Sequence, residues 1–272
     1  MAEVEEPMVE RESMVGRRGM IRLAAGTAVL GVGSVALAAC GATIPGAVAI
    51  SKSGGASLNV ATAKPANAAT MVSVDNGSYS LVAQAGIIGS GVKEDACTYF
   101  FTRASQDGTY SCEVKNQPAA SKDGGWGTAG LMARQSGDAG SPMVGIFATT
   151  QQGVQFMWRS TYRGATSIWP MAIAIGVNAP IWVQLAKSGS NWTVMYSQTG
   201  KAGSWKNSTS MSVPFSGSSY LIGLAASSHS KAQALDVFSE LTGFKTAPSM
   251  YLDINAANTA ANSSSASSSS SK

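Results

Sequence analysis

Short apolar runs separated by turn residues constrain the fold of this chain more than any other feature. Between residues 71 and 247 such runs recur, for example ACTYFFTR, TYSCEV, MVGIFAT, APIWVQLAKSG and YLIGLAASSH. Gly, Asn, Asp and Pro separate them, which is the pattern of β-strands joined by tight turns. About ten to twelve strands without a convincing helix predict an all-β, two-sheet antiparallel β-sandwich or jelly roll. Segment 230–241 has the most helix-like pattern, but LDVFSELTGF alternates well enough to be the closing strand.

A low charge density indicates where the protein works. Charged residues make up 12% of the chain, about half their usual share in globular proteins. Serine, threonine, asparagine, glutamine and glycine must therefore cover much of the surface, as is common in exported proteins. The basic residues are scattered, without the stripe that a nucleic-acid-binding surface needs. We therefore expect no nucleic-acid partner.

The first 40 residues differ from the rest in composition and lack the strand pattern. Arg17 and Arg18 precede a weakly apolar run, rich in alanine and glycine, over residues 23–39, which suits the hydrophobic region of a signal peptide. The arginine pair and the apolar residues behind it resemble a twin-arginine export signal. The stretch LAAC, ending at Cys40, resembles a lipobox, which a lipoprotein peptidase cuts before the cysteine. We predict export and lipidation of Cys40, which would hold the protein on the outer side of the cytoplasmic membrane or at the cell surface.

Other processing routes also fit this segment. The apolar run can remain as an uncleaved anchor helix. Alternatively, the ordinary signal peptidase can cut after ALA at 36–38 or near ANA at 66–68. That cleavage would release the protein without a lipid.

Two further segments lack the strand pattern. Residues 41–70 contain no aromatic residue and little periodicity, so we expect a flexible tether. Residues 248–272 end in NSSSASSSSSK, which is too polar to order itself. The predicted organisation is an export signal with lipobox at 1–40, a tether at 41–70, a β-sandwich domain at 71–247 and a disordered serine-rich tail at 248–272.

Two cysteines remain once Cys40 is assigned to the anchor. Cys97 and Cys112 flank TYFFTRASQDGTYS, in which SQDG reads as a turn between two strands. Alternation places each cysteine on a face with aromatic or apolar neighbours, so both sulfurs can point into one core layer. An exported chain works where disulfides persist. We predict a disulfide that stabilises the fold by about 3 kcal/mol in the chain-entropy model; two small buried thiols are the alternative.

The order of the strand motifs resembles a known family. Along the chain follow DACTYFFTRASQDGTYSCEV, GGWGTAGLMARQS, VQFMWRSTYRGA, PIWVQLAKSGSNWTVMYSQTGKAGSW and YLIGLAASSHSKAQALDVFSEL. Over residues 71–244 this order resembles concanavalin A-like sandwich modules, specifically the laminin-G-like domains of bacterial secreted and cell-wall proteins. These include modules of unnamed function that are appended to glycosidases and related to a yeast regulator of enolase. The resemblance implies two packed antiparallel sheets, one of them curved, with a concave face where sugars often bind.

Two positions depart from the family pattern. SQTG at residues 197–200 replaces the usual Ser-x-Asp-Gly turn, and Arg134-Gln135 replaces Arg-Glu. Each change removes a carboxylate, so a metal or catalytic site built on those acids loses its support. The sandwich itself does not depend on them.

Catalytic patterns are missing from the sequence. The chain has ten acids after residue 40, and none of the expected strands carries the acid-x-acid spacing that presents two carboxylates on one face. His229 is the only histidine, without a G-x-S-x-G elbow, and we expect it to form a hydrogen bond in a loop or at a strand end. We expect neither a cofactor nor zinc. A structural calcium ion at a loop aspartate or at backbone carbonyls is compatible with the sequence.

Binding of a glycan or a cell-wall polysaccharide is the better-supported chemistry. Aromatic rings stack on sugar rings, and amide and guanidinium groups bond their hydroxyls. In VQFMWR, Val154, Phe156 and Trp158 share one strand face, and Gln155, Met157 and Arg159 share the other. The candidate ligand-binding residues are Arg134, Trp158, Arg159, Tyr162, Trp169 and Gln184, with Arg163 and Trp182 as further candidates. Core packing of the tryptophans is the alternative reading, as is pairing of the two strand arginines with an acid or with backbone carbonyls.

These observations predict an exported, lipid-anchored, non-catalytic carbohydrate-binding or cell-wall-associated module. A structural or adhesive protein that binds another protein through an exposed sheet edge is the alternative. An enzyme related to glycoside hydrolases is disfavoured, because the carboxylate pair is missing.

Overall fold

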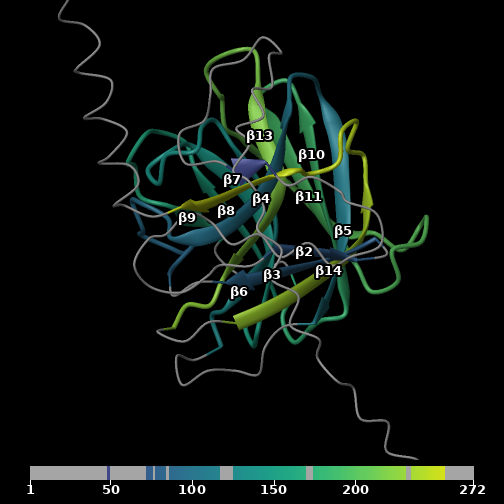
Figure 1. Ribbon diagram of the computed structural model, residues 1–272. Coiled ribbons are helices and arrows are strands. Elements are labelled where there is room, and N and C mark those ends of the chain that lie inside the picture. The colour runs from purple at the N-terminus through teal and green to yellow at the C-terminus, as the bar shows by residue number, and fades with distance from the viewer. Residues whose placement is uncertain are drawn as a thin grey trace, which may run out of the picture. The chain divides into compact units, whose positions relative to one another are not determined.

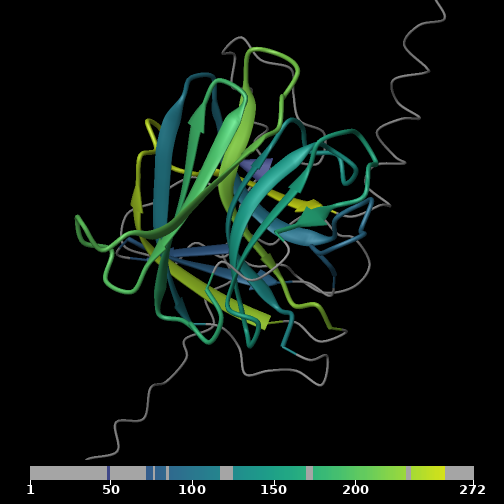
Figure 2. The same ribbon diagram turned by 180° about the vertical axis from the view of Figure 1, so that it is seen from behind.

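Two antiparallel sheets make up the described part of the computed structural model, which covers residues 48–49, 72–75, 77–83, 86–116, 125–169, 174–230 and 234–254. The sheets lie face to face (Figures 1 and 2). These residues form no helix, and hence none that could cross a membrane.

The larger sheet has eight strands and the smaller one seven. The eight-stranded sheet has the order β1 (Val48–Ala49), β15 (Met250–Ile254), β4 (Cys97–Ala104), β13 (Tyr220–Ser227), β6 (Thr128–Arg134), β7 (Met143–Thr149), β8 (Val154–Arg159) and β9 (Ser167–Ile168). The seven-stranded sheet has the order β12 (Lys206–Ser212), β11 (Asn191–Ser197), β10 (Ile181–Ser188), β5 (Gly108–Asn116), β14 (Ala234–Thr242), β3 (Ser78–Ala83) and β2 (Val72–Asp75). In Figure 1, β5, β10 and β11 stand on the right, and β7, β8 and β9 on the left.

The core between the sheets follows from the alternation of apolar and polar residues along the strands. In β10, Ile181, Val183 and Leu185 are fully buried, whereas the residues between them are partly exposed. From the opposite sheet, β8 contributes Val154 and Phe156 to the same core. The structure confirms the predicted all-β fold, a sandwich of two antiparallel sheets.

The eight-stranded sheet is also apolar on its other face. Every residue of β6, β7 and β13 is buried, because a second apolar cluster covers the face that points away from the seven-stranded sheet. This outer cluster consists of Ile88, Cys97, Tyr99, Phe101, Met132, Ala139, Met143, Phe147, Met157, Leu221, Ala225, Leu252 and Ile254. Strands buried on both faces read as continuous apolar runs, as AGLMA, MVGIFA and YLIGLAA do here.

The predicted Cys97–Cys112 disulfide is wrong, because both cysteines are free, buried thiols. The short turn between β4 and β5 carries the chain from one sheet to the other. β4 pairs with β13 and β15, whereas β5 pairs with β10 and β14. Cys97 therefore lies in the outer cluster, and Cys112 lies in the core between the sheets.

The sandwich extends beyond the predicted limits of residues 71 and 247. β15 lies in the segment predicted as a disordered tail, where it pairs with β4 and buries Tyr251, Leu252 and Ile254. β1 lies in the predicted tether and pairs with β15. The apolar residues that begin the C-terminal segment thus order a strand ahead of the serine-rich sequence.

The strand interpretation of segment 230–241 is confirmed by β14. Arg17, Arg18 and Cys40 lie outside the described residues, so export and lipidation stay predictions.

Candidate functional site

The six predicted ligand-binding residues do not come together. Arg134 and Arg159 end β6 and β8 on the outer side of the eight-stranded sheet, whereas Gln184 lies on the outer face of the seven-stranded sheet. Trp158 and Trp169 pack against the core between the sheets. The side chain of Tyr162 is exposed on the loop between β8 and β9.

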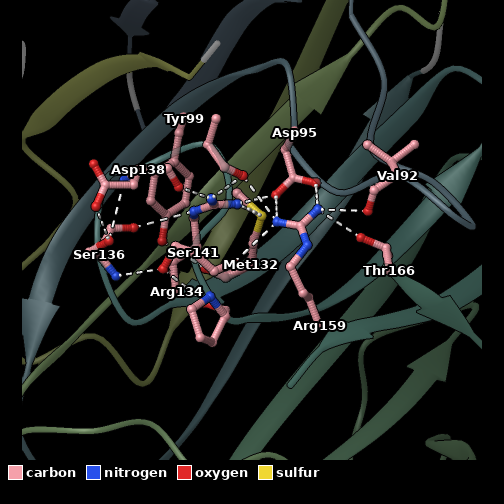
Figure 3. A network of polar contacts seen from close by, with 12 residues as sticks. Val92, Asp95, Tyr99, Met132, Arg134, Ser136, Asp138, Ser141, Arg159 and Thr166 are labelled. Carbon is pink, nitrogen blue, oxygen red and sulfur yellow. Dashed lines mark hydrogen bonds and ion pairs between the residues drawn. The ribbon is translucent and has the colours of Figure 1, made fainter. Parts of the chain in front are cut away.

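Arg134 and Arg159 share one buried carboxylate, that of Asp95 (Figure 3). Nη2 of Arg159 donates to Oδ1 of Asp95 at 2.6 Å, and its Nη1 donates to Oδ2 at 3.0 Å. Nη1 of Arg134 donates to the same Oδ2. All three side chains are 0% exposed in these ion pairs. Two cations therefore face one anion, and backbone carbonyls must satisfy the remaining N–H groups.

Backbone carbonyls from three loops complete this Arg–Asp–Arg cluster. Arg159 donates to the carbonyls of Val92, Ala139, Ser141 and Gly164 and to the hydroxyl of Thr166. Arg134 donates to the carbonyls of Ser136, Asp138 and Ala139. The cluster thus fastens loops 86–96, 135–142 and 160–166 over the eight-stranded sheet. With no exposed donor left, Arg134 and Arg159 cannot contact a ligand here, which corrects the prediction and agrees with the structural alternative.

The outer face of the seven-stranded sheet, unlike that of the eight-stranded sheet, carries mainly polar side chains. Its side chains project away from the core because their chain neighbours, such as Cys112 and Val183, lie in that core. Two rows cross β5, β10 and β11: Glu113, Trp182 and Ser197 in one, and Ser111, Gln184 and Met195 in the next. Directly opposite residues in a sheet touch. This face therefore offers one aromatic ring among carboxylate, amide and hydroxyl groups.

Trp182 is held in place from two sides. Its indole Nε1 donates to Oε2 of Glu240 at 2.7 Å. Gly200 packs against the ring, since a Cβ added there would lie 2.6 Å from Cδ1 and Nε1 of the indole. The hydroxyl of Ser197 accepts from the backbone N–H groups of Thr199 and Gly200 at 3.1 and 2.9 Å. The SQTG turn therefore forms without an aspartate and supports the tryptophan.

Glu240 owes its position to an irregularity in β14. The register of β14 against β5 shifts between Ser239 and Thr242, and Glu240 has a left-handed φ of 51°. Bulges of this kind redirect a side chain and are frequent beside functional sites. A left-handed backbone is costly for a residue other than glycine and is a reason to look for function. Next to it, the hydroxyl of Ser239 donates to the buried carboxylate of Glu113.

A hollow of about 450 Å³ opens where β3, β5 and β14 meet. Its lining consists of Gly77, Ser78, Tyr79, Lys115, Ser239, Glu240 and Leu241. Partial burial raises the pKa of Tyr79 above its ordinary value, so its hydroxyl stays protonated near neutral pH. Glu240 connects the hollow to Trp182. We call Trp182, Gln184, Glu113, Glu240 and the hollow the polar face.

Metal-binding geometry does not occur in the described residues, which contain no group of three His, Cys, Asp or Glu side chains that could hold an ion. Asp107 and Asp138, two aspartates in loops, have protein partners. Asp107 accepts from Lys187 and from the backbone N–H of Gly189, each at 2.8 Å, and these bonds lower its pKa. Asp138 accepts from the hydroxyl of Ser136 at 3.1 Å.

Sequence reasoning missed Glu113, Lys115 and Glu240. The first two occupy alternate positions of TYSCEVK beside an inward-facing cysteine, so period-two alternation already placed them on the outer face. For Glu240 no such signal exists, because the bulge in β14 decides where its side chain points.

No family model and no curated protein match the sequence. Among solved structures, a functionally unknown protein from Saccharomyces cerevisiae is 18% identical, with a TM-score of 0.50, over 68% of this chain and 94% of that one. A GH43 protein from Bacillus licheniformis is 13% identical, with a TM-score of 0.43, over 62% of this chain and 33% of that one. The β-glucanase of Bacillus licheniformis is 11% identical, with a TM-score of 0.36, over 64% and 94%. The yeast protein thus shares the fold of this chain.

Proposed function

We propose that the protein is an exported, lipid-anchored, non-catalytic module that binds a glycan or a cell-wall polysaccharide on the polar face. The observation that carries this proposal is the setting of Trp182, whose ring lies among hydrogen-bonding side chains next to a hollow. Solved structures with low similarity to this chain include a lectin in complex with GalNAc and several glycoside hydrolases.

The polar face suits the chemistry of a sugar. An aromatic ring covers the apolar side of a pyranose, while carboxylate, amide and hydroxyl groups bond the sugar hydroxyls. Trp182 supplies the ring, and Gln184 and Lys115 supply donors and acceptors. The outer cluster and its loops cover the outer face of the eight-stranded sheet. Of the two outer faces, the polar face is therefore the one that a sugar can reach.

Binding without catalysis agrees with the hydrogen bonds that the carboxylates of Glu113 and Glu240 accept. Glycoside hydrolysis needs an acid and a second carboxylate that is free to act as nucleophile or base. Glu113 is buried and accepts from Ser239, and Glu240 accepts from the indole of Trp182. Both carboxylates are therefore engaged in holding the polar face together.

Export and anchoring rest on the sequence of residues 1–40. The arginine pair Arg17-Arg18 and the lipobox that ends at Cys40 support a place on the outer side of the cytoplasmic membrane or at the cell surface. Labelling with a palmitate analogue tests the anchor, since Cys40→Ser should abolish incorporation. Equal labelling of the two proteins would reject it.

Retention on insoluble polysaccharides tests the binding function. Purified full-length protein is applied to cellulose, xylan, chitin and peptidoglycan, and the bound fraction is measured against concentration. We expect at least one of them to retain the protein, and Trp182→Ala to weaken that retention about tenfold or more, as loss of an aromatic anchor does. Tyr162→Ala is the matched control, because its ring is exposed on a loop outside the polar face.

Two results would overturn the proposal. One is the absence of retention on all four polysaccharides. The other is undiminished retention of Trp182→Ala together with loss of retention in Tyr162→Ala, which would move the site to the loop between β8 and β9.

An exposed strand edge favours protein binding as the second candidate. Among the described strands, β12 pairs with β11 alone, so its other edge presents unpaired backbone groups to which an extended segment can add. The backbone N–H of Ser210 points to this free edge, because those of Val213 and, by alternation, Thr209 point to the β11 side. Capture of a protein partner that is lost in Ser210→Pro, without retention on any polysaccharide, would favour this function over the first.

A further inference from the structure

Three loops bring exposed apolar side chains together at one end of the sandwich. Ile87 precedes β4, Trp126 precedes β6 and His229 follows β13. β13 pairs antiparallel with both β4 and β6, so the starts of those two strands and the end of β13 lie at the same end. Ile87 is 42% exposed and Trp126 37%, and they are two of the five large hydrophobic side chains that the described residues expose.

These side chains form one continuous patch. The rings of Trp126 and His229 have centroids 6.5 Å apart and are tilted by 38°. Gly89 lies between His229 and Ile87, because a Cβ added to it would lie 3.8 Å from Nε2 of His229 and 3.4 Å from Cγ2 of Ile87. We call Ile87, Gly89, Trp126 and His229 the end patch.

The loops that carry the end patch are fixed by hydrogen bonds. Thr150 and Gln151 donate their backbone N–H groups to the carbonyls of Gly127 and Gly125, each at 3.0 Å, on either side of Trp126. The N–H of Ala96 donates to the carbonyl of Ile87 at 3.1 Å. These contacts hold the tryptophan and the isoleucine in place before any ligand arrives, which lowers the entropic cost of binding.

His229 is held in a backbone conformation that suggests function. Its φ is 52°, which few residues other than glycine adopt without a reason. The hydroxyl of Ser228 donates to the carbonyl of Ser230 and accepts its N–H, so a small turn encloses the histidine. Within the described part of the chain, neither ring nitrogen of His229 nor the indole N–H of Trp126 has a hydrogen-bond partner, so the hydrogen bond predicted for His229 does not form among these residues. The end patch therefore combines aromatic surface with polar atoms that no other described residue bonds.

We propose that the end patch is a second saccharide-binding site, which takes a single neutral pyranose unit. The ring stacks on Trp126, its hydroxyls bond to the imidazole of His229 and the indole N–H, and Ile87 contacts its apolar edge. A membrane or a protein surface would need a much larger apolar area, whereas this patch is limited to two rings and one aliphatic side chain. Its rim is polar, with Thr150, Gln151, Ser228 and Ser230. The proposal does not depend on the polar face, because the two sites share no residue.

Observation of individual tryptophan signals tests this site. Full-length protein labelled with ¹⁵N at its six tryptophan indoles is titrated with the methyl β-glycosides of glucose, galactose, xylose and N-acetylglucosamine. Trp126→Phe and Trp182→Phe assign the two signals concerned. We expect at least one glycoside to shift the Trp126 signal saturably, with a dissociation constant on the order of 1–10 mM, as for small ligands that bind one face.

Variants of the end patch test whether the shift of the Trp126 signal arises from binding to its residues. Using the same glycoside, we expect Trp126→Ala to weaken binding about tenfold or more by ligand-observed saturation transfer, and His229→Asn to weaken it as well. Asparagine tolerates the left-handed φ at this position, so that variant removes the ring and keeps the turn. Trp182→Ala, in which the end patch is intact, should leave the Trp126 shift unchanged.

The outcomes separate the two sites. If none of the glycosides shifts the Trp126 signal, the end patch is not a saccharide site, whatever happens at Trp182. A Trp126 shift that persists unchanged in His229→Asn would also refute the proposed arrangement. A shift of Trp126 in a protein that no polysaccharide retains would support the end patch and contradict the polar face.

Discussion

Asp95 and its neighbour Glu94 allow a direct test of what the Arg–Asp–Arg cluster does for the fold. Asp95→Asn keeps the shape of the side chain but removes its charge and turns one acceptor oxygen into a donor. That donor then faces the N–H groups of Arg134 and Arg159. Both guanidinium groups stay buried, because the loops above them enclose them completely.

The expected loss follows from the contacts. Asp95 accepts three hydrogen bonds from charged donors, and each such bond contributes roughly 1.5–3 kcal/mol. Removal of one partner of a buried ion pair costs about 3–5 kcal/mol, because it leaves an uncompensated charge. We expect Asp95→Asn to lower the free energy of unfolding by this amount. For a domain of this size that is a melting temperature roughly 6–20 °C lower.

Glu94→Gln is the matched control. Glu94 pairs with Arg163 at 2.7 Å, but their side chains are 28% and 56% exposed, and exposed pairs contribute below about 1 kcal/mol. The two variants differ by one position and remove the same charge. Urea unfolding followed by tryptophan fluorescence measures both, with circular dichroism to confirm the strand content.

Two results would refute this reasoning. One is equal stability of Asp95→Asn and Glu94→Gln, since buried and exposed pairs would then contribute alike. The other is wild-type stability of Asp95→Asn, which would mean that the backbone carbonyls alone satisfy both arginines.

Three further predictions concern the core, the thiols and the polar face. Burial raises the pKa of Asp236 from 3.8 to about 8, so its contribution to stability is present below pH 3.8 and is lost as the pH rises to 8. Relative to Asp236→Asn, the wild-type free energy of unfolding should thus fall steadily as the pH rises over that range in urea titrations; parallel profiles would contradict this. The melting temperature should be the same with and without reductant, since Cys97 and Cys112 form no disulfide; a decrease corresponding to about 3 kcal/mol would show that they do. Gly200→Ala places a methyl group 2.6 Å from the indole of Trp182 at a backbone φ of 68°, so polysaccharide retention and the melting temperature should both fall, and unaltered retention in the folded variant would remove Trp182 from the site.

The sequence alone predicted which residues share a strand face. In β8, the apolar set Val154 and Phe156 faces the core, and Gln155, Met157 and Arg159 face the other way, as alternation required. The same rule placed Gln184 outward on β10. It also predicted the class of fold, because repeated short runs between turn residues leave a sandwich as the way to bury their apolar faces.

Only the tertiary structure decided which sheet each strand joins. β4 and β5 are separated by a short turn, yet they belong to different sheets, which places Cys97 and Cys112 on opposite sides of the eight-stranded sheet. Alternation likewise could not show that loops cover the outer side of that sheet and bury Arg134 and Arg159. Nor could it place Glu240, which reaches Trp182 through an irregular register between β14 and β5. The physical reason is the range of the interactions: strand faces follow from the local backbone, whereas pairing, covering loops and bulges depend on contacts between segments far apart in the chain.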